Sequence, residues 1–280
     1  MSLKGMIFDL QRGSVVDGPG MRTGVFFKGC NLRCAWCHNP ESHSLHPELL
    51  FYQERCTHCG LCGQVCPSGL EDCRACGLCQ DYCATEARRL CGREYTVEDL
   101  MDELLADRDF YRTTGGGVTF SGGECLLQPD FLARVLERCG EEGVHRAVDT
   151  AGHVDWSVFE RILPVTDLFL YDIKSMDSGV HRRYTGVDNR RILDNLGRLL
   201  DTGKAVWVRV PVVCGVNDTT EEMKAIAAFL RGHRWPERIE LLPYHTMGRN
   251  KWLALGRQPE AFERPGPESM ARLNAIFEKE

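Results

Sequence analysis

The sequence lacks long hydrophobic runs and any excess of basic residues. No segment approaches the roughly 18 consecutive apolar residues of a membrane-spanning helix, and no basic stretch followed by an apolar one opens the chain. Lys and Arg total 34 against 40 Asp and Glu, a formal net charge of -6. Nucleic acid and anionic membranes select the opposite sign. We therefore expect a cytoplasmic protein with no nucleic-acid or membrane partner.

Cysteine, in contrast, is abundant, with 15 among 280 residues. A reducing compartment disfavours disulfide bonds, so cysteines in such number more often bind metal or carry out redox chemistry. Eleven of them fall into three regularly spaced groups. The other four, Cys91, Cys125, Cys139 and Cys214, stand alone and are predicted to be small buried side chains.

Short β-branched or aromatic runs alternate with helical patterns along most of the chain, which is typical of βα units around a parallel sheet. Six strands are predicted, at 22–28, 118–121, 145–149, 168–173, 206–213 and 238–242. Helices are predicted at 96–107, 131–139, 180–200 and 221–230, the first with a threonine cap and a carboxylate three residues later. The expected fold class is α/β, with ligand-binding loops after the strands.

One segment, residues 56–83, breaks this rhythm with eight cysteines and few large apolar side chains. Because it has too little apolar surface for a core of its own, it is predicted to be held together by metal. The chain is accordingly divided into the start of the α/β domain at 1–50, an insertion at 51–90 and the remainder of the domain at 91–280.

The insertion contains the spacing C-x2-C-x2-C-x3-C twice, beginning at Cys56 and, 17 residues later, at Cys73. Bacterial ferredoxins use this run, in which three close cysteines hold one cubane cluster and the fourth reaches the neighbouring cluster. Two structural zinc sites are the alternative, although zinc sites rarely place three cysteines so close together. The two predicted ligand sets are Cys56, Cys59, Cys62 and Cys83, and Cys66, Cys73, Cys76 and Cys79.

The first cysteine group differs, because Cys30, Cys34 and Cys37 form only a triplet, C-x3-C-x2-C. Three thiolates bind three irons of a cubane and leave the fourth iron open to an exogenous ligand. An open coordination position is typical of catalytic metal sites, whereas a closed one is structural or carries electrons.

This triplet, with Trp36 before its last cysteine, resembles the cluster loop of radical S-adenosylmethionine (SAM) enzymes. The segment SGGE at 121–124 resembles the superfamily's GGE segment, whose backbone meets the SAM amino group. The resemblance implies that SAM chelates the open iron and that the reduced cluster passes it one electron, which releases methionine and a 5′-deoxyadenosyl radical. Cys30, Cys34 and Cys37 are then the catalytic cysteines.

Longer motifs narrow the resemblance to the activating enzymes of glycyl radical enzymes, the family of pyruvate formate-lyase activating enzyme. They are DGPG-x-R at 17–22, HNP after Cys37, DTAG at 149–152, YTG at 184–186 and LLPYHTMG at 241–248, in the family's order. The resemblance covers essentially the whole chain, and most of the family also carries the ferredoxin-like insertion. It implies a partial (β/α)6 barrel of the radical SAM type, open on one side so that a protein segment can enter.

The same resemblance implies a set of functional residues. Asp17 is implied to meet the backbone of the incoming glycine loop, and the acidic residues matched by Asp149 and Asp172 are associated with SAM and a monovalent cation. The implied SAM-binding residues are Trp36, Cys37, His38, Gly122, Gly123, Glu124, Asp149, Asp172, Ile173, Lys174, Ser175, Arg209 and His245.

The function implied is that of an activase, which cleaves SAM reductively and removes a hydrogen atom from a backbone glycine of a partner glycyl radical enzyme. Three 4Fe-4S clusters and SAM are the expected cofactors, and flavodoxin or ferredoxin is the expected electron donor. Three alternatives remain: a radical SAM enzyme for a small molecule or another peptide, a ferredoxin-like electron carrier, and a zinc-binding interaction protein.

Overall fold

The computed structural model describes residues 3–278, and its centre is an eight-stranded sheet in the order β10-β9-β8-β7-β6-β2-β1-β5. All six predicted strands are confirmed, and neighbouring members of this set pair in parallel. They are β2 (Arg22–Phe27), β6 (Gly117–Gly122), β7 (His145–Thr150), β8 (Leu168–Asp172), β9 (Ala205–Val212) and β10 (Arg238–Pro243).

Two further strands of this sheet, β1 (Lys4–Ser14) and β5 (Arg93–Thr96), were not predicted. β1 pairs antiparallel with both β2 and β5, and its register with β2 shifts twice. Because of these irregularities, β1 lacks the regular alternation of apolar and polar residues by which a strand is predicted from sequence. The sheet is open in the described chain, with β10 and β5 as its edges, as expected of a partial barrel.

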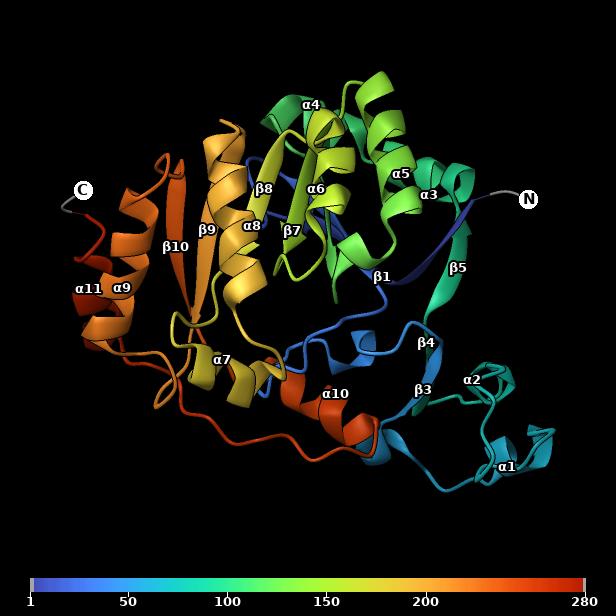
Figure 1. Cartoon of the computed structure of the whole chain (residues 1–280). Coiled ribbons are helices and arrows are strands. Elements are labelled where there is room, and N and C mark those ends of the chain that lie inside the picture. Colours follow the sequence, from blue (N-terminus) through green and yellow to red (C-terminus); the bar gives the residue numbers. More distant parts are fainter. Residues whose placement is uncertain (1–2, 279–280) are drawn as a thin grey trace.

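Helices cover one face of the sheet, where Figure 1 shows α5, α6, α8 and α9 side by side. The predicted helices α3 (Val97–Leu105), α5 (Pro129–Glu141) and α9 (Thr220–Arg231) are confirmed. The predicted helix 180–200 is wrong as one element, because Gly186 at φ 85° ends α7 and separates it from α8. The others are α4 (Arg108–Thr114), α6 (Trp156–Ile162), α7 (Ser178–Thr185), α8 (Arg190–Asp201), α10 (Arg249–Ala254) and α11 (Pro267–Asn274).

Short 3-10 helices occur in the connections: η1 (Pro40–Ser42), η2 (Gln53–Arg55), η3 (Cys125–Leu127), η4 (Leu163–Val165) and η5 (Thr246–Gly248). Figure 1 places α7 and α10 below the carboxyl ends of the parallel strands. None of the helices in residues 3–278 combines the length and the hydropathy that crossing a bilayer requires.

The main core lies between the sheet and its helices. In β9, Val206, Val208 and Val210 are buried, and they alternate with Trp207 and Arg209, which are only partly buried. Successive side chains of a strand point to opposite faces, so Trp207 and Arg209 belong to the face away from the helices. That face is apolar at the middle of the strands and charged at their carboxyl ends.

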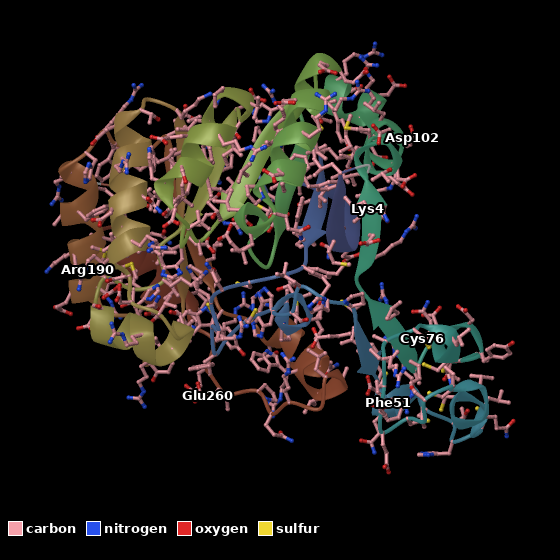
Figure 2. The ribbon with its side chains drawn as sticks, turned by 45° about the vertical axis from the view of Figure 1, so that its right-hand side comes forward. Lys4, Phe51, Cys76, Asp102, Arg190 and Glu260 are labelled. Atoms are coloured by element: carbon pink, nitrogen blue, oxygen red, sulfur yellow. The ribbon has the colours of Figure 1, made fainter. Side chains whose placement is uncertain are left out.

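The cysteine-rich segment forms a small lobe beside the sheet, as Figures 1 and 2 show. It leaves and re-enters the domain through β3 (Glu48–Phe51) and β4 (Arg88–Cys91), which pair antiparallel. Its helices α1 (Leu61–Val65) and α2 (Leu78–Asp81) each follow a glycine of positive φ, Gly60 and Gly77. Among residues 51–90 only Cys79 and Ala87 are buried, so this lobe has almost no apolar core.

The capping box of α3 gives a test of local stability. Thr96 accepts a hydrogen bond from the Asp99 N–H at 3.1 Å, and Asp99 accepts one from the Thr96 N–H at 3.3 Å. We expect Thr96→Ala to lower the free energy of unfolding by about 1 kcal/mol in guanidinium titrations, because the Asp99 N–H loses its acceptor and the capping box is left with one of its two hydrogen bonds. Asp102→Ala on the same helix, which removes no cap, is the control, and an equal loss in both variants would contradict the assignment.

Candidate active site

A cavity of about 580 Å³ lies at the carboxyl ends of the parallel strands. Its walls come from loops after β2, β6, β7, β8 and β10 and from the segment that joins β1 to β2. Thirteen of the predicted site residues line it: Asp17, Cys30, Cys34, Trp36, Cys37, His38, Gly122, Gly123, Asp149, Asp172, Lys174, Arg209 and His245.

The cysteine triplet occupies the loop after β2, and backbone hydrogen bonds fix this loop to the end of α7. The N–H groups of Arg33 and Ala35 donate to the carbonyls of Thr185 and Tyr184 at 2.7 and 2.8 Å. Burial raises the pKa of Cys30 to about 12 and also raises the pKa values of Cys34 and Cys37. Three buried thiols on one loop are a donor set that a soft metal centre would bind as thiolates.

The C-terminal part of the chain supports the same loop from the other side. The Trp252 indole N–H donates to the Cys37 carbonyl at 2.9 Å, and Lys251 Nζ donates to Asn39 Oδ1 at 2.8 Å. At Gly248 an added Cβ would lie 2.7 Å from the Cα of His38, so only glycine allows this approach. Sequence reasoning missed α10, the helix that carries Lys251 and Trp252.

Charged side chains from the β1–β2 segment, β7, β8 and β9 meet inside the cavity. Arg209 Nη1 lies 3.6 Å from Asp17 Oδ1 and 3.8 Å from Asp149 Oδ2, and its Nε lies 3.8 Å from Asp172 Oδ1. These separations are too long for hydrogen bonds, and Arg209 Nε and Nη1 and Asp172 Oδ1 are buried without partners. Buried polar atoms without partners are costly, so this centre suits a ligand that carries both a cationic and an anionic group.

Lys174 completes this charged centre, with its Nζ donating to Asp172 Oδ2 at 2.8 Å. Burial is the largest single effect and lowers the pKa of Lys174, but the nearby negative charges, that of Asp172 first, and the hydrogen bond to Asp172 together outweigh it, so the net pKa is raised and the ammonium stays charged. Burial also raises the pKa of Asp149, and the charge of Arg209 opposes that rise.

Aromatic rings form another wall of the cavity. The imidazoles of His38 and His245 are stacked with their centroids 3.8 Å apart, and His38 Nε2 donates to the His245 carbonyl at 2.9 Å. Burial lowers the pKa of His38 to about 4, so the ring is neutral at pH 7. Trp36 packs against Tyr184 and Phe262, each with centroids 6.1 Å away. A neutral, flat and partly apolar wall suits a heteroaromatic ring.

The glycines after β6 let the chain pass close to the start of the cysteine loop. At Gly122, with φ 116°, an added Cβ would lie 2.2 Å from the backbone nitrogen of Phe27. At Gly123 it would lie 2.4 Å from the Gly29 carbonyl oxygen. Both positions therefore require glycine, and together they bring backbone into the cavity wall.

Three predicted residues do not line the cavity: Glu124, Ile173 and Ser175. Asp172 and Lys174 line the cavity, whereas Ile173 between them and Ser175 after them do not, as expected where side chains alternate in extended backbone. Ile173 belongs to the main core, and Ser175 Oγ accepts a hydrogen bond from the Asp177 N–H at 3.2 Å. The geometry therefore does not support contact between the side chains of these two residues and a ligand in the cavity.

The Glu124 carboxylate is fully buried and points to the loop after β7. It accepts hydrogen bonds from the Thr150 hydroxyl at 2.8 and 2.9 Å and from the Ala151 N–H at 3.1 Å. Glu124 thereby ties the glycine segment to the DTAG loop, so it positions two walls of the cavity instead of entering it.

Sequence reasoning missed several residues of the cavity wall. Ser121 donates to Asp149 Oδ2 at 2.7 Å and was detectable, because it stands two positions before the well-marked Gly123. Thr150 and Ala151 follow directly on Asp149. Tyr244 stands directly before His245 in the LLPYHTMG motif and was detectable from it, whereas Arg264 lies in a segment where no pattern indicated it.

Comparison with known proteins agrees with this site. The model of the radical SAM superfamily matches residues 25–230. The chain belongs to this superfamily. Curated relatives that are 40% identical over 90% or more of this chain are activating enzymes of glycyl radical enzymes. Within the superfamily the chain therefore belongs to these activating enzymes, which use SAM to generate a radical and remove a hydrogen atom from a glycine. Membership favours an enzyme over the electron-carrier and zinc-protein alternatives.

Several curated relatives support the narrower family. The chain is 40% identical to the trans-4-hydroxy-L-proline dehydratase activating enzyme of Clostridioides difficile, over 98% of this chain and 96% of the relative. It is 40% identical to the choline trimethylamine-lyase activating enzyme of Oleidesulfovibrio alaskensis, over 90% and 87%. A domain of a pyruvate-formate lyase-activating enzyme from Bacteroides vulgatus superposes with a TM-score of 0.51 at 36% identity, covering 59% of this chain and 94% of that domain.

A more distant structure, SuiB of Streptococcus suis, shares the fold alone. It gives a TM-score of 0.58 at 14% identity and covers 89% of this chain and 43% of SuiB. The α/β fold with its mostly parallel sheet is thus the radical SAM fold.

In this radical SAM protein the cysteine-rich lobe contains two smaller cavities. One of about 160 Å³ is lined by Cys56, Cys59, Cys62 and Cys83, and a second of about 10 Å³ by Cys66, Cys73, Cys76 and Cys79. The sulfur atoms of the lobe gather around these positions near Cys76 in Figure 2. Each cavity therefore draws its fourth cysteine from the other half of the duplicated segment. No three His, Cys, Asp or Glu side chains in residues 3–278 are arranged around a single metal ion.

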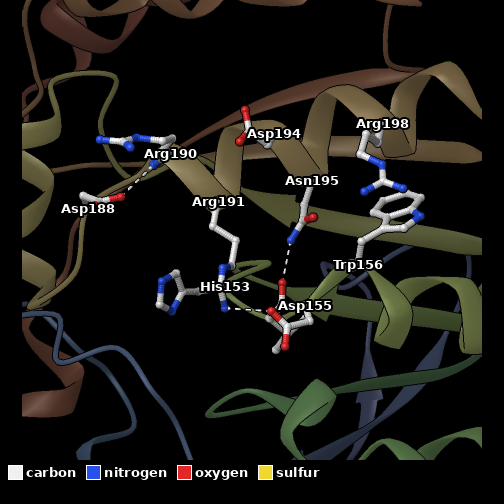
Figure 3. Close-up of a pocket in the computed structure, with 10 residues that line it drawn as sticks. His153, Asp155, Trp156, Asp188, Arg190, Arg191, Asp194, Asn195 and Arg198 are labelled. Atoms are coloured by element: carbon white, nitrogen blue, oxygen red, sulfur yellow. Dashed lines mark hydrogen bonds and ion pairs between the residues drawn. The ribbon is translucent and has the colours of Figure 1, made fainter.

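Another cavity, of about 460 Å³, lies between α6 and α8 on the outside of the radical SAM domain (Figure 3). Its polar side chains are largely engaged with one another: Arg191 pairs with Asp155 at 3.1 Å, and Arg198 lies over the Trp156 ring at 4.1 Å. None of the predicted site residues lines it. We assign it no part in the chemistry.

Glu124 gives a test of this site through pH. Burial raises its pKa to about 7, above the value of about 4.3 in an unfolded chain, so between these values the folded state binds more protons. The contribution of Glu124 to the free energy of unfolding is therefore fully present below pH 4 and is lost as the pH rises through 7. Glu124→Gln should flatten the fall in unfolding free energy between pH 5 and 8. The control is Glu137→Gln, an exposed residue of α5, and an unchanged pH slope in Glu124→Gln would contradict the burial argument.

Proposed function

We propose that the 580 Å³ cavity binds SAM beside a 4Fe-4S cluster held by Cys30, Cys34 and Cys37. The observation that carries this is the meeting, in one cavity, of three thiols, an arginine with unpartnered buried nitrogens and two stacked imidazoles. When bound and reduced, the cluster supplies the electron that cleaves SAM into methionine and a 5′-deoxyadenosyl radical.

The residues of this chain would then bind and orient SAM. Arg209 suits its carboxylate, because a guanidinium pairs with a carboxylate through two hydrogen bonds. Asp149 and Asp172 suit the amino group and the sulfonium by charge. Lys174 and Arg209 already supply positive charge to these carboxylates, and this lessens the need for the monovalent cation expected there.

The adenine would lie along Trp36, His38 and His245. Backbone at Gly122 and Gly123 approaches the cavity without side chains and so leaves room for the amino group. A partly enclosed site that excludes water protects a reactive radical from side reactions.

The substrate we propose is a glycine in a loop of a partner glycyl radical enzyme. The 5′-deoxyadenosyl radical takes one hydrogen atom from the glycine Cα, which gives 5′-deoxyadenosine and leaves the unpaired electron on that carbon. Glycine has no Cβ to obstruct the approach. Relatives at 36 to 40% identity are named for activating dehydratases, a lyase, a decarboxylase and a synthase. We therefore propose that the surface of the activating enzyme that receives the glycine loop selects the partner.

The rim of the cavity offers such a surface. Val15 and Val16 are 69% and 71% exposed directly before Asp17, and Met247 is 80% exposed shortly after His245. Exposed apolar side chains around a polar cavity are typical of a protein-binding rim. Asp17, held by the Ser14 hydroxyl at 2.6 Å, is placed to meet the backbone of an entering loop.

For the lobe we propose two 4Fe-4S clusters in the ferredoxin arrangement, with the ligand sets given by the two four-cysteine cavities. An electron-transfer role is supported by Leu61, Leu78 and Tyr82, which are 42%, 42% and 56% exposed around these cavities and could receive a carrier. We propose flavodoxin or ferredoxin as that donor. Electron-transfer complexes use small contact areas of this kind.

The cysteine triplet is tested by 5′-deoxyadenosine release. Anaerobically reconstituted, dithionite-reduced protein should release 5′-deoxyadenosine from SAM, and Cys34→Ala should fall to the level without protein, because the cluster loses a ligand. Cys214→Ala, a lone cysteine outside the cavity, is the matched control and should retain the parent rate. Parent-level release by Cys34→Ala in chromatographic assays would overturn the assignment.

The rim is tested with Val15→Asp. A new carboxylate must be desolvated when the partner binds, so we expect glycyl radical formation, measured by electron paramagnetic resonance at limiting partner, to fall about tenfold, equal to roughly 1.4 kcal/mol. Release of 5′-deoxyadenosine without partner should not change. Phe110→Asp on α4, which is 56% exposed and lies away from the cavity, is the control. An equal loss in both variants would exclude the rim as the docking surface.

A further inference from the structure

The two halves of the cysteine-rich lobe repeat each other in their local hydrogen bonds. The His58 N–H lies 3.4 Å from Cys56 Sγ, and the Ala75 N–H lies 3.5 Å from Cys73 Sγ. Ser68 and Thr85 stand equally close to the fourth cysteine of each run, at 3.9 and 3.8 Å. Differences between the two sites must therefore come from residues outside this repeated framework.

The clearest difference is a reversal of charge. The repeat interval of 17 residues relates Arg88 to Glu71. Arg88 lines the cavity of Cys56, Cys59, Cys62 and Cys83, whereas Glu71 is exposed and does not line the other cavity. The second cavity has its own arginine, Arg74, but this side chain is 76% exposed and lies 3.7 Å from Asp72. Solvent and Asp72 both weaken the field of Arg74 at its cavity.

Arg88 is held in place but lacks a polar partner. Its guanidinium lies over the Phe51 ring, 4.2 Å from the centroid, in the paired strands that lead into the lobe. Its Nε is buried without a hydrogen-bond partner, and it has no ion pair within residues 3–278. An unpartnered buried N–H donor, on a residue that lines a cavity with four cysteines, indicates a ligand with acceptor sulfurs.

We propose, on the basis of the two clusters proposed above, that Arg88 raises the reduction potential of the cluster held by Cys56, Cys59, Cys62 and Cys83 above that of its duplicate. One-electron reduction adds a negative charge to a cluster, and a fixed cation with an N–H donor stabilises that charge. Arg88 thus makes one of two otherwise matched sites the preferred holder of an incoming electron. It is a positioning and tuning residue that does not act on SAM.

The test uses the full chain with Cys30, Cys34 and Cys37 changed to alanine, so that only the lobe can hold clusters. Reconstituted protein is titrated with dithionite and followed by electron paramagnetic resonance, which separates the two midpoints. In R88Q we expect the higher of the two midpoint potentials to fall by about 59 mV. For a one-electron couple this shift lowers the ratio of reduced to oxidised cluster about tenfold at the parent's midpoint potential. In R74Q, the control, each midpoint potential should change by less than a third of that shift.

Iron analysis separates this proposal from the one on which it rests. About eight irons per chain are needed for two cubanes, and a markedly lower content in the reconstituted parent would contradict the clusters themselves. With full iron, unchanged midpoints in R88Q would overturn the role of Arg88. If R88Q takes up less iron, R88M decides: it keeps an apolar stem over Phe51 but lacks the charge and the N–H donors, so a fall of the same midpoint is expected, and no fall would overturn the proposal.

Discussion

One guanidinium, Arg209, faces three carboxylates at the carboxyl edge of the sheet, and the rest of the site depends on this unfinished pairing. At separations of 3.6 to 3.8 Å the charges attract one another but form no hydrogen bonds. Charges held in a protein interior without full partners are costly. The fold maintains this arrangement because β7, β8 and β9 are fixed in parallel register, so that Asp149, Asp172 and Arg209 cannot move closer independently.

The cysteine loop is held by elements that lie far from it in the sequence. α7 accepts its backbone hydrogen bonds on one side, and Gly248 and Trp252 contact it on the other. Glu124 similarly joins the glycine segment to the DTAG loop. The walls of the cavity therefore share their supports, which favours a preorganised site over one assembled by the ligand.

The lobe follows a different physical rule. With only Cys79 and Ala87 buried among residues 51–90, apolar burial contributes little to it, and metal ligation would supply the missing stability. A duplicated segment of this kind begins with two equivalent sites. Substitutions outside the repeated framework, such as arginine at 88 opposite glutamate at 71, are the means by which such sites come to differ.

The sequence by itself determined the six parallel strands and the spacing of the cysteine groups, and it predicted that the two groups of the lobe exchange their fourth members, because these features depend on alternation, spacing and duplication. It also indicated most residues of the cavity through motifs at strand ends. It did not indicate β1, α10 or the break between α7 and α8, whose patterns are short or irregular. Only the tertiary structure decided that Ile173, Ser175 and Glu124 do not line the cavity while Arg264 does, because side-chain direction depends on strand pleat and on packing between segments distant in the chain.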